Sequence, residues 1–453
     1  MPSRSRLPPR PLRALARAVA AALALLALAL PAGAQMLIRD AEIEATLKRL
    51  ATPLFRSAGI GASTIDVLVI DDASLNAFVI NGRAIFVHSG LIARMESPAM
   101  LQSVLSHELA HIAAGHLVRR GLNAQNANTA IGIGMLLALA VSVGGNGAAA
   151  GGIAAGTAGA AVSTFLANTR SEETIADQLG LRYLVRARID PKAALEVLDL
   201  FRGQEALSPG RQDPYLRTHP LSRERIRALK AQIAAYAGRP TETPDETAYW
   251  FARMQAKFRG FLGNPSYVLR KLDKGDRSEA ATLTRAIAYH RQGKLKPALD
   301  SMAALLAARP DDAYYHELRG QILLEGRQAA AAVQSYRRAV ALAPKEPLIL
   351  AGLGRAQLAL NSRSGNRQAL ATLRRAYGMD PRDARMLRDL SVAWARAGNN
   401  GMAALTAAER YALMGRFKDA ETNAKRAEGL LARGSFGWLR AQDILAAAKQ
   451  LKH

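Results

Sequence analysis

The segment His107-Glu108-Leu109-Ala110-His111 is the part of this chain that most restricts its fold. Residues four positions apart share one face of an α-helix, so His107 and His111 can present their imidazoles to one metal ion. Glu108 lies beside them, where its carboxylate can take a proton from a water molecule bound to that ion. The motif therefore requires a helix at this point and a further ligand from elsewhere in the chain.

The residues before the motif predict a helix that begins at Pro98. Ser97 is a favoured N-cap residue, and proline is favoured at the first helical position. An apolar stripe with helical spacing then reaches the motif and comprises Met100, Leu101, Val104 and Leu105. The sequence thus places both histidines inside a helix.

A second helical segment, residues 170–186, offers the missing ligand. It contains Glu173 and Asp177, which lie four positions apart and can face the same site. We interpret Glu173 as the third ligand of a Zn²⁺ ion, and Asp177 as the acceptor that fixes the tautomer of one ligand histidine. The chain has no cysteine, so histidine and carboxylate side chains are the ligands available to it.

A histidine ten residues after His107 would be the competing third ligand, but that position holds Leu117. The neighbouring His116 would lie about 140° around the helix from His111, at about 100° per residue. We therefore expect His116 to be a surface histidine.

These motifs resemble those of the gluzincin peptidases related to the CAAX prenyl protease and the heat-shock protease HtpX. The resemblance rests on the HELAH segment, on the pair Glu173 and Asp177, and on Leu75-Asn76-Ala77-Phe78. The most similar branch is that of the BepA-type (YfgC-like) periplasmic proteases, which carry tetratricopeptide repeats after the catalytic domain.

The resemblance implies a zinc endopeptidase with one Zn²⁺ per chain, in which Glu108 removes a proton from water and returns it to the leaving amine. It also implies unfolded or misassembled outer-membrane β-barrel proteins as substrates, with the repeats docking on the assembly machinery. The alternative is a chaperone or assembly scaffold in which the repeats dominate and proteolysis is secondary. A zinc-stabilised binding protein without turnover is disfavoured because Glu108 is intact.

Local patterns predict a small β-sheet ahead of the metal helix. Residues 40–56 have the apolar spacing of a helix, and Asn81-Gly82 is a strong hairpin turn. Three strands are expected, at residues 65–70, 78–80 and 84–87.

In the resembling peptidases an edge strand of this sheet accepts substrate as an added strand, which gives main-chain recognition with little demand on sequence. We assign that role to Asn76, Ala77 and Phe78. An ordinary core strand and turn is the alternative interpretation of the same three residues.

The segment from Thr218 to Ile226 resembles the His-Pro-x-x-x-x-Arg-Ile segment of the same family. His219 can approach the metal as a fourth ligand, which would displace water and keep the enzyme latent, or it can donate to the oxyanion of the reaction. The alternative is that His219-Pro220 only starts a helix, with Arg225 packing nearby.

Residues 1–34 predict a secretory signal peptide. They begin with an arginine-rich stretch, continue with an apolar run at 18–30, and end in Ala32-Gly33-Ala34, which fits a cleavage site. A membrane anchor is the alternative, but the run is shorter than the span of about 20 residues that a bilayer needs. We therefore expect a periplasmic protein, cleaved near Ala34.

The formal net charge of +24 favours acidic partners or contact with an anionic membrane surface. The plainer interpretation is that solvated arginines cover the surfaces of helical repeats. A nucleic-acid partner is not expected, because the protein is predicted to be exported and carries no binding motif for one.

An Ala/Gly-rich segment at residues 130–162 separates the two helices that carry the predicted metal ligands. Its apolar part is too short and its glycine content too high for a membrane span. We interpret it as a mobile lid or a membrane-contacting hairpin, with a loosely ordered flap as the alternative.

The C-terminal half repeats. Pro310 and Pro344 are 34 residues apart, and Pro381 follows after 37. This spacing, with recurring small positions, is the tetratricopeptide pattern, in which stacked helix pairs leave a concave binding surface. The repeat register is left open after Asp383.

The sequence thus predicts a mainly α protein with a gluzincin-like metalloprotease domain that contains a small β-sheet, followed by a tetratricopeptide-repeat α-solenoid. The expected parts are a signal peptide (1–34), the protease domain (35–238), a linker (239–246) and the repeat domain (247–453).

Overall fold

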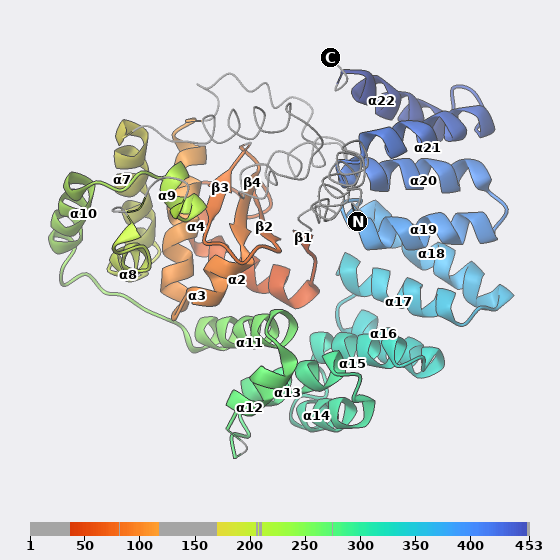
Figure 1. The fold of residues 1–453 in the computed structure, drawn as a ribbon, viewed down its shortest axis with the longest axis horizontal. Helices are drawn as coiled ribbons and strands as arrows, with labels where there is room; N and C mark the ends of the chain where they lie inside the picture. The colour runs from red at the N-terminus through yellow and green to blue at the C-terminus, as the bar shows by residue number, and fades with distance from the viewer. Residues whose placement is uncertain are drawn as a thin grey trace, which may run out of the picture.

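The computed structural model describes residues 37–80, 82–116, 170–204, 207, 211–273 and 275–450. The predicted signal peptide at 1–34 and the Ala/Gly-rich segment at 130–162 lie outside the described residues. The remainder is predominantly helical, as predicted, with a mixed α/β part beside a curved row of stacked helices (Figure 1). No helix in the described ranges has the length and apolar character that crossing a bilayer requires.

The α/β part surrounds a small sheet. Its elements are β1 (Leu37–Ile38), α2 (Ala41–Ser57), β2 (Asp66–Ile70), β3 (Ala77–Val79), β4 (Ala84–His88), α3 (Ser89–Arg94), α4 (Pro98–Ala113), α7 (Arg170–Arg186), α8 (Ala193–Asp199), α9 (Pro214–Thr218) and α10 (Arg223–Ala235). The helices predicted at 40–56, from Pro98 and at 170–186 are confirmed within one or two residues.

The sheet has the strand order β1-β2-β4-β3, with β2 parallel to β4 and the two outer pairs antiparallel. The predicted hairpin is confirmed, since Val79 of β3 pairs with Ile85 of β4 across a short connection. Asn81 in that turn lies outside the described residues. β3 forms one edge of the sheet, and α9 packs against it.

Helix α4 is the central helix of this part and is buried on all sides from Met100 to His111. Its start is the predicted one, because the Ser97 hydroxyl accepts a hydrogen bond from the Met100 N–H at 3.2 Å. α4 packs against α2, the sheet, α8 and, most extensively, α7. A helix so enclosed can hold side chains in a dry, fixed environment.

Gly180 sets the close approach of α7 to α4. A Cβ atom built at this position would lie 3.4 Å from the backbone of His107, so an alanine would just touch α4 and a side chain larger than alanine would push the helices apart. The Ser106 hydroxyl donates to the Gly180 carbonyl at 2.7 Å and ties the two helices together. This contact brings the acidic residues of α7 to the histidines of α4.

The second part is a solenoid. Its helices are α11 (Asp245–Leu262), α12 (Pro265–Lys271), α13 (Glu279–Arg291), α14 (Leu295–Ala308), α15 (Ala313–Glu325), α16 (Ala329–Leu342), α17 (Pro347–Ala359), α18 (Arg363–Met379), α19 (Ala384–Arg396), α20 (Asn400–Leu413), α21 (Phe417–Leu430) and α22 (Phe436–Gln450). Each packs against the next, as stacked repeats require.

The repeat register that the sequence left open after Asp383 is now clear. Asp383 caps the start of α19, and Gly398 and Gly415 have positive φ angles in the turns before α20 and α21. These two glycines are only 17 residues apart because a single helix separates them.

A buried ion network joins the solenoid to the α/β part. Arg253 of α11 is 1 % exposed and pairs with Glu42 of α2 and with Asp312, which caps α15. Lys257, also on α11, is fully buried and pairs with Asp40 at 2.6 Å. Buried charges of this kind are tolerated only when each has a partner, so the network fixes how the two parts meet.

Replacing Arg253 by leucine should lower the free energy of unfolding by about 3 kcal/mol, because Asp312 would lose its buried cation and Glu42 would keep only Lys257, at 3.4 Å. Lys296→Leu is the control, since Lys296 and Asp300 form a largely exposed pair and should contribute less than about 1 kcal/mol. Urea denaturation followed by circular dichroism measures both. Equal, small losses for the two variants would contradict a stabilising role for the network.

Candidate metal centre

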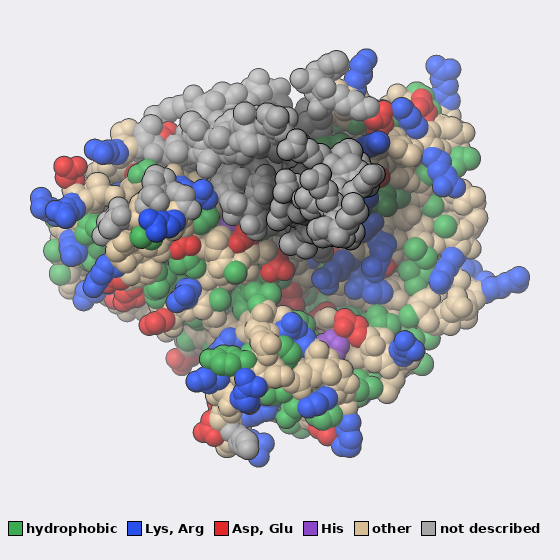
Figure 2. Space-filling view, in the orientation of Figure 1, with side chains coloured by type: hydrophobic (Ala, Val, Ile, Leu, Met, Phe, Trp, Pro, Cys, Tyr) green, Lys and Arg blue, Asp and Glu red, His purple; other side chains and the backbone are tan. Residues whose placement is uncertain are grey.

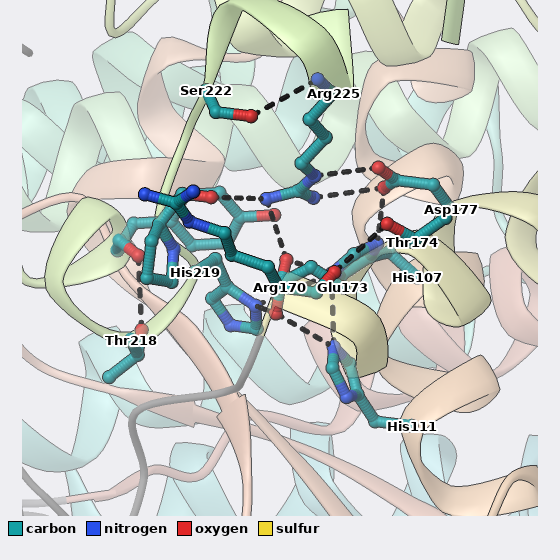
Figure 3. Close-up of polar contacts among 12 residues, drawn as sticks. His107, His111, Arg170, Glu173, Thr174, Asp177, Thr218, His219, Ser222 and Arg225 are labelled. Carbon is teal, nitrogen blue, oxygen red and sulfur yellow. Dashed lines mark hydrogen bonds and ion pairs between the residues drawn. The ribbon is translucent and has the colours of Figure 1, made fainter. Parts of the chain in front are cut away.

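Four side chains distant in sequence meet in one buried cluster. They are His107 and His111 of α4, Glu173 of α7 and His219 at the end of α9, and their ligand-type atoms all lie within 4.8 Å of one another. His107 Nε2 is 3.1 Å from His111 Nε2 and 3.4 Å from Glu173 Oε2 (Figure 3). His111 Nε2 is 3.3 Å from Glu173 Oε1. The two predicted helices therefore converge on one point.

Asp177 lies beside this cluster, where its Oδ1 is 3.1 Å from Nδ1 of His107. An acceptor at Nδ1 keeps the proton there and leaves Nε2 free to bind a metal. Asp177 is thus placed on the side of His107 away from Glu173.

Arg225 of α10 joins the two acidic residues of α7. Its guanidinium contacts Glu173 Oε2 at 2.6 Å and Asp177 Oδ2 at 2.6 Å (Figure 3). The sequence analysis considered this arginine only as a packing residue near His219. The spacing of the His-Pro-x-x-x-x-Arg segment could have indicated it. Arg225 lies six residues after His219, in the first turn of α10, and so returns a cation to the site.

The cluster's electrostatics agree with its contacts. Burial alone would raise the pKa of Glu173, but His219, Arg225 and His107 hold it well below its usual range. Burial lowers the pKa of His111 to about 3. Burial also opposes protonation of His107, yet Glu173 and Asp177 raise its pKa to about 10. An ionised carboxylate and a neutral imidazole are metal-binding forms, and metal binding would displace the proton from His107.

Glu108 is fully buried next to the cluster. Neither of its carboxylate oxygens has a hydrogen-bond partner among the residues that the structure describes, although Nε2 of His219 lies 3.3 Å from Oε1. Burial raises the pKa of Glu108. Buried carboxylate oxygens without partners are costly, and they fit a site completed by a metal ion and its bound water.

His219 lies inside the cluster. Its Nδ1 is 2.9 Å from Glu173 Oε1 and 3.3 Å from His107 Nε2, and its ring packs at a tilt against Tyr215 with centroids 4.6 Å apart. It is the C-cap residue of α9 and precedes the start of α10 by four residues. The structure brings it to the place where a fourth ligand would sit.

The segment predicted to bind substrate lies against His219. Asn76 is buried and its carbonyl accepts a hydrogen bond from the His88 N–H at 2.9 Å, within the β3–β4 pairing. Hydrogen-bonded positions alternate along such a pair, so Ala77 directs its main chain away from β4, and its carbonyl is 3.2 Å from Nε2 of His219. Phe78 is a core residue that stacks on Phe86.

The expectation that His116 is a surface histidine is wrong. It is fully buried, and its Nδ1 lies 2.9 Å from Nδ1 of His111. The helical angle does not apply to it, because α4 ends at Ala113 and Gly115 adopts a φ of +66° that turns the chain back.

Comparisons with known proteins agree with this site. Residues 38–233 match the model of Peptidase family M48. The chain is 27% identical over 430 residues to the Beta-barrel assembly-enhancing protease of Escherichia coli (strain K12), covering 93% of this chain and 86% of that protein. It is 27% identical over 194 residues to the Mitochondrial metalloendopeptidase OMA1 of Schizosaccharomyces pombe, covering 41% of this chain and 51% of that protein.

Among solved structures, a thermophilic TPR protein of Thermus thermophilus is similar to this chain at 20% sequence identity and a TM-score of 0.28. The match covers 37% of this chain and 100% of the Thermus thermophilus chain. The match to a peptidase family agrees with the buried cluster of three histidines and Glu173, and with the position of Glu108 beside it. Residues 38–233 are similar to Peptidase family M48, and the enzyme is a metalloendopeptidase.

Proposed function

We propose that this chain is a zinc endopeptidase of the bacterial periplasm that acts in quality control and assembly of outer-membrane β-barrel proteins. The observation that carries the proposal is the buried convergence of His107, His111 and Glu173 beside Glu108. The cellular role follows the name of the Escherichia coli relative, Beta-barrel assembly-enhancing protease, which matches this chain over most of its length. A periplasmic location agrees with the signal peptide that the sequence predicts.

His107, His111 and Glu173 would hold one Zn²⁺ ion through two imidazole nitrogens and a carboxylate. The bound ion would supply Lewis-acid chemistry to the scissile peptide and acidify its water. Glu108 accepts a proton at its carboxylate and delivers it to the leaving amine, and burial raises its pKa, which makes the carboxylate a stronger base. Asp177 and Arg225 orient His107 and Glu173 from outside the cluster.

His219 would act as the switch of this site. Its imidazole lies among the ligand atoms, where it would occupy the fourth position and exclude water. The same ring contacts the outward-facing carbonyl of Ala77 through Nε2. Displacing His219 would therefore free both the metal position and the main chain of the edge strand. A role as donor to the oxyanion remains the competing assignment for this residue.

Substrate would bind along β3. Ala77 and, two residues on, Val79 direct main-chain groups away from β4, at the edge of the sheet next to the metal cluster. An extended polypeptide can add to such an edge through main-chain hydrogen bonds, with little dependence on its side chains. Recognition of this kind suits unfolded or misassembled envelope proteins, whose exposed segments share no sequence.

The solenoid would dock on the assembly machinery. A cavity of about 440 Å³ opens between β1 and helices α15, α17 and α19, and its lining holds both cations, such as Arg355 and Arg385, and carboxylates, such as Glu317 and Asp383. Figure 2 shows Lys and Arg side chains gathered in the hollow beside these helices. The Lys and Arg side chains in this hollow suit acidic segments of a partner protein, and the basic charge of the chain also suits contact with an anionic membrane surface.

Glu108→Gln should retain zinc and lose cleavage by at least about 100-fold, because the amide cannot move the proton. Zinc content by elemental analysis and cleavage of an unfolded outer-membrane protein measure the two properties. The variant should also fail to restore outer-membrane assembly in cells that lack the protein. Full restoration by Glu108→Gln would favour the scaffold alternative, in which proteolysis is secondary.

His219→Ala should raise the rate of cleavage of the same unfolded protein, since the fourth metal position and the Ala77 carbonyl both become accessible. His290→Ala is the control, because His290 lies on the solenoid and pairs with Glu325. A rate equal to that of the wild type would remove the switch, and a loss of about 100-fold would assign His219 to the oxyanion instead.

A further inference from the structure

Each of the two histidines of α4 has a partner on the ring nitrogen that faces away from Glu173. For His107 the partner is Asp177, whereas His111 Nδ1 lies 2.9 Å from Nδ1 of His116. We infer that His116 is a positioning residue of the metal site, which holds the imidazole of His111 in its metal-binding tautomer and orientation. This inference rests on the proposed zinc site.

The end of α4 places His116 by backbone geometry. The Gly115 N–H donates to the Ile112 carbonyl at 3.0 Å, and the His116 N–H donates to the His111 carbonyl at 3.2 Å. With the positive φ of Gly115, these two bonds form a Schellman motif. His111 and His116 are the two positions whose side chains meet in this motif, so the turn itself sets their contact.

The tautomers follow from the distances. Nε2 of His111 faces the cluster, 3.1 Å from His107 Nε2 and 3.3 Å from Glu173 Oε1, so it is the ligand atom. A neutral imidazole that binds metal through Nε2 carries its proton on Nδ1. His111 must then donate from Nδ1, and His116 must accept with the lone pair of its own Nδ1.

The chemistry of the turn favours this role over simple packing. An apolar side chain commonly makes the side-chain contact in a Schellman motif, and it would need no polar partner there. A fully buried imidazole has a desolvation cost that only its hydrogen bonds offset. Histidine at this position therefore points to a requirement for an acceptor beside His111.

The matched variants are His116→Asn and His116→Leu in the full-length chain. The Oδ1 atom of asparagine branches from Cγ, as Nδ1 of histidine does, so it can accept the same hydrogen bond. Leucine supplies the apolar contact that the motif favours, but it offers no acceptor. The pair separates loss of the acceptor from loss of packing.

Zinc affinity should be measured by competition with a chelator of known affinity. His116→Leu should bind zinc about 10-fold to 100-fold more weakly than the wild type, and His116→Asn should stay within about threefold of it. After treatment with a chelator, the Leu variant should unfold at a temperature no lower than that of the wild type treated in the same way. Cobalt-substituted wild type and Asn variant should share one visible absorption spectrum, from which the Leu variant departs.

Three results would overturn specific parts of this scheme. Wild-type zinc affinity in His116→Leu overturns the role of His116 and leaves the zinc site intact. Loss of affinity in a folded His116→Asn variant equal to that in His116→Leu also overturns it, because an acceptor is then insufficient. Zinc affinity that survives His107→Ala and His111→Ala unchanged overturns the proposed zinc site itself. If His116→Leu does not fold, the Asn variant alone decides.

Discussion

The close packing of α7 on α4 is the contact on which this enzyme depends. Gly180 lets the two helices approach, and their facing residues then bring two imidazoles and a carboxylate together in a dry environment. Charges buried in this way must be balanced by neighbours. Arg225 supplies that balance by pairing with Glu173 and with Asp177. Helix α10 is therefore part of the centre although it carries none of the four clustered residues.

His219 connects three features that are separate in the sequence. It lies among the ligand atoms, contacts the edge strand through Ala77, and packs against Tyr215. One ring thus contacts both the buried cluster and the edge strand of the sheet. On the other side of the α/β part, the buried pairs of Arg253 hold α2 to the solenoid. The peptidase part is therefore fixed relative to the repeats.

Local rules predicted much of this architecture. The Ser97 cap, the hairpin between β3 and β4 and the 34-residue repeats depend on neighbouring residues, and each was found where the sequence placed it. The surface assignment of His116 failed for a local reason as well. A helical angle was extended past the helix end, where one residue with positive φ reverses the chain.

The sequence by itself determined which residues can bind a metal, because spacing by four on a helix sets two ligands on one face. It also determined the repeat period, which reflects the length of a helix pair. Only the tertiary structure decided that Arg225 balances the buried carboxylates and that His219 reaches Ala77. These contacts join elements whose separation along the chain carries no periodic signal, so they form only when the helices pack.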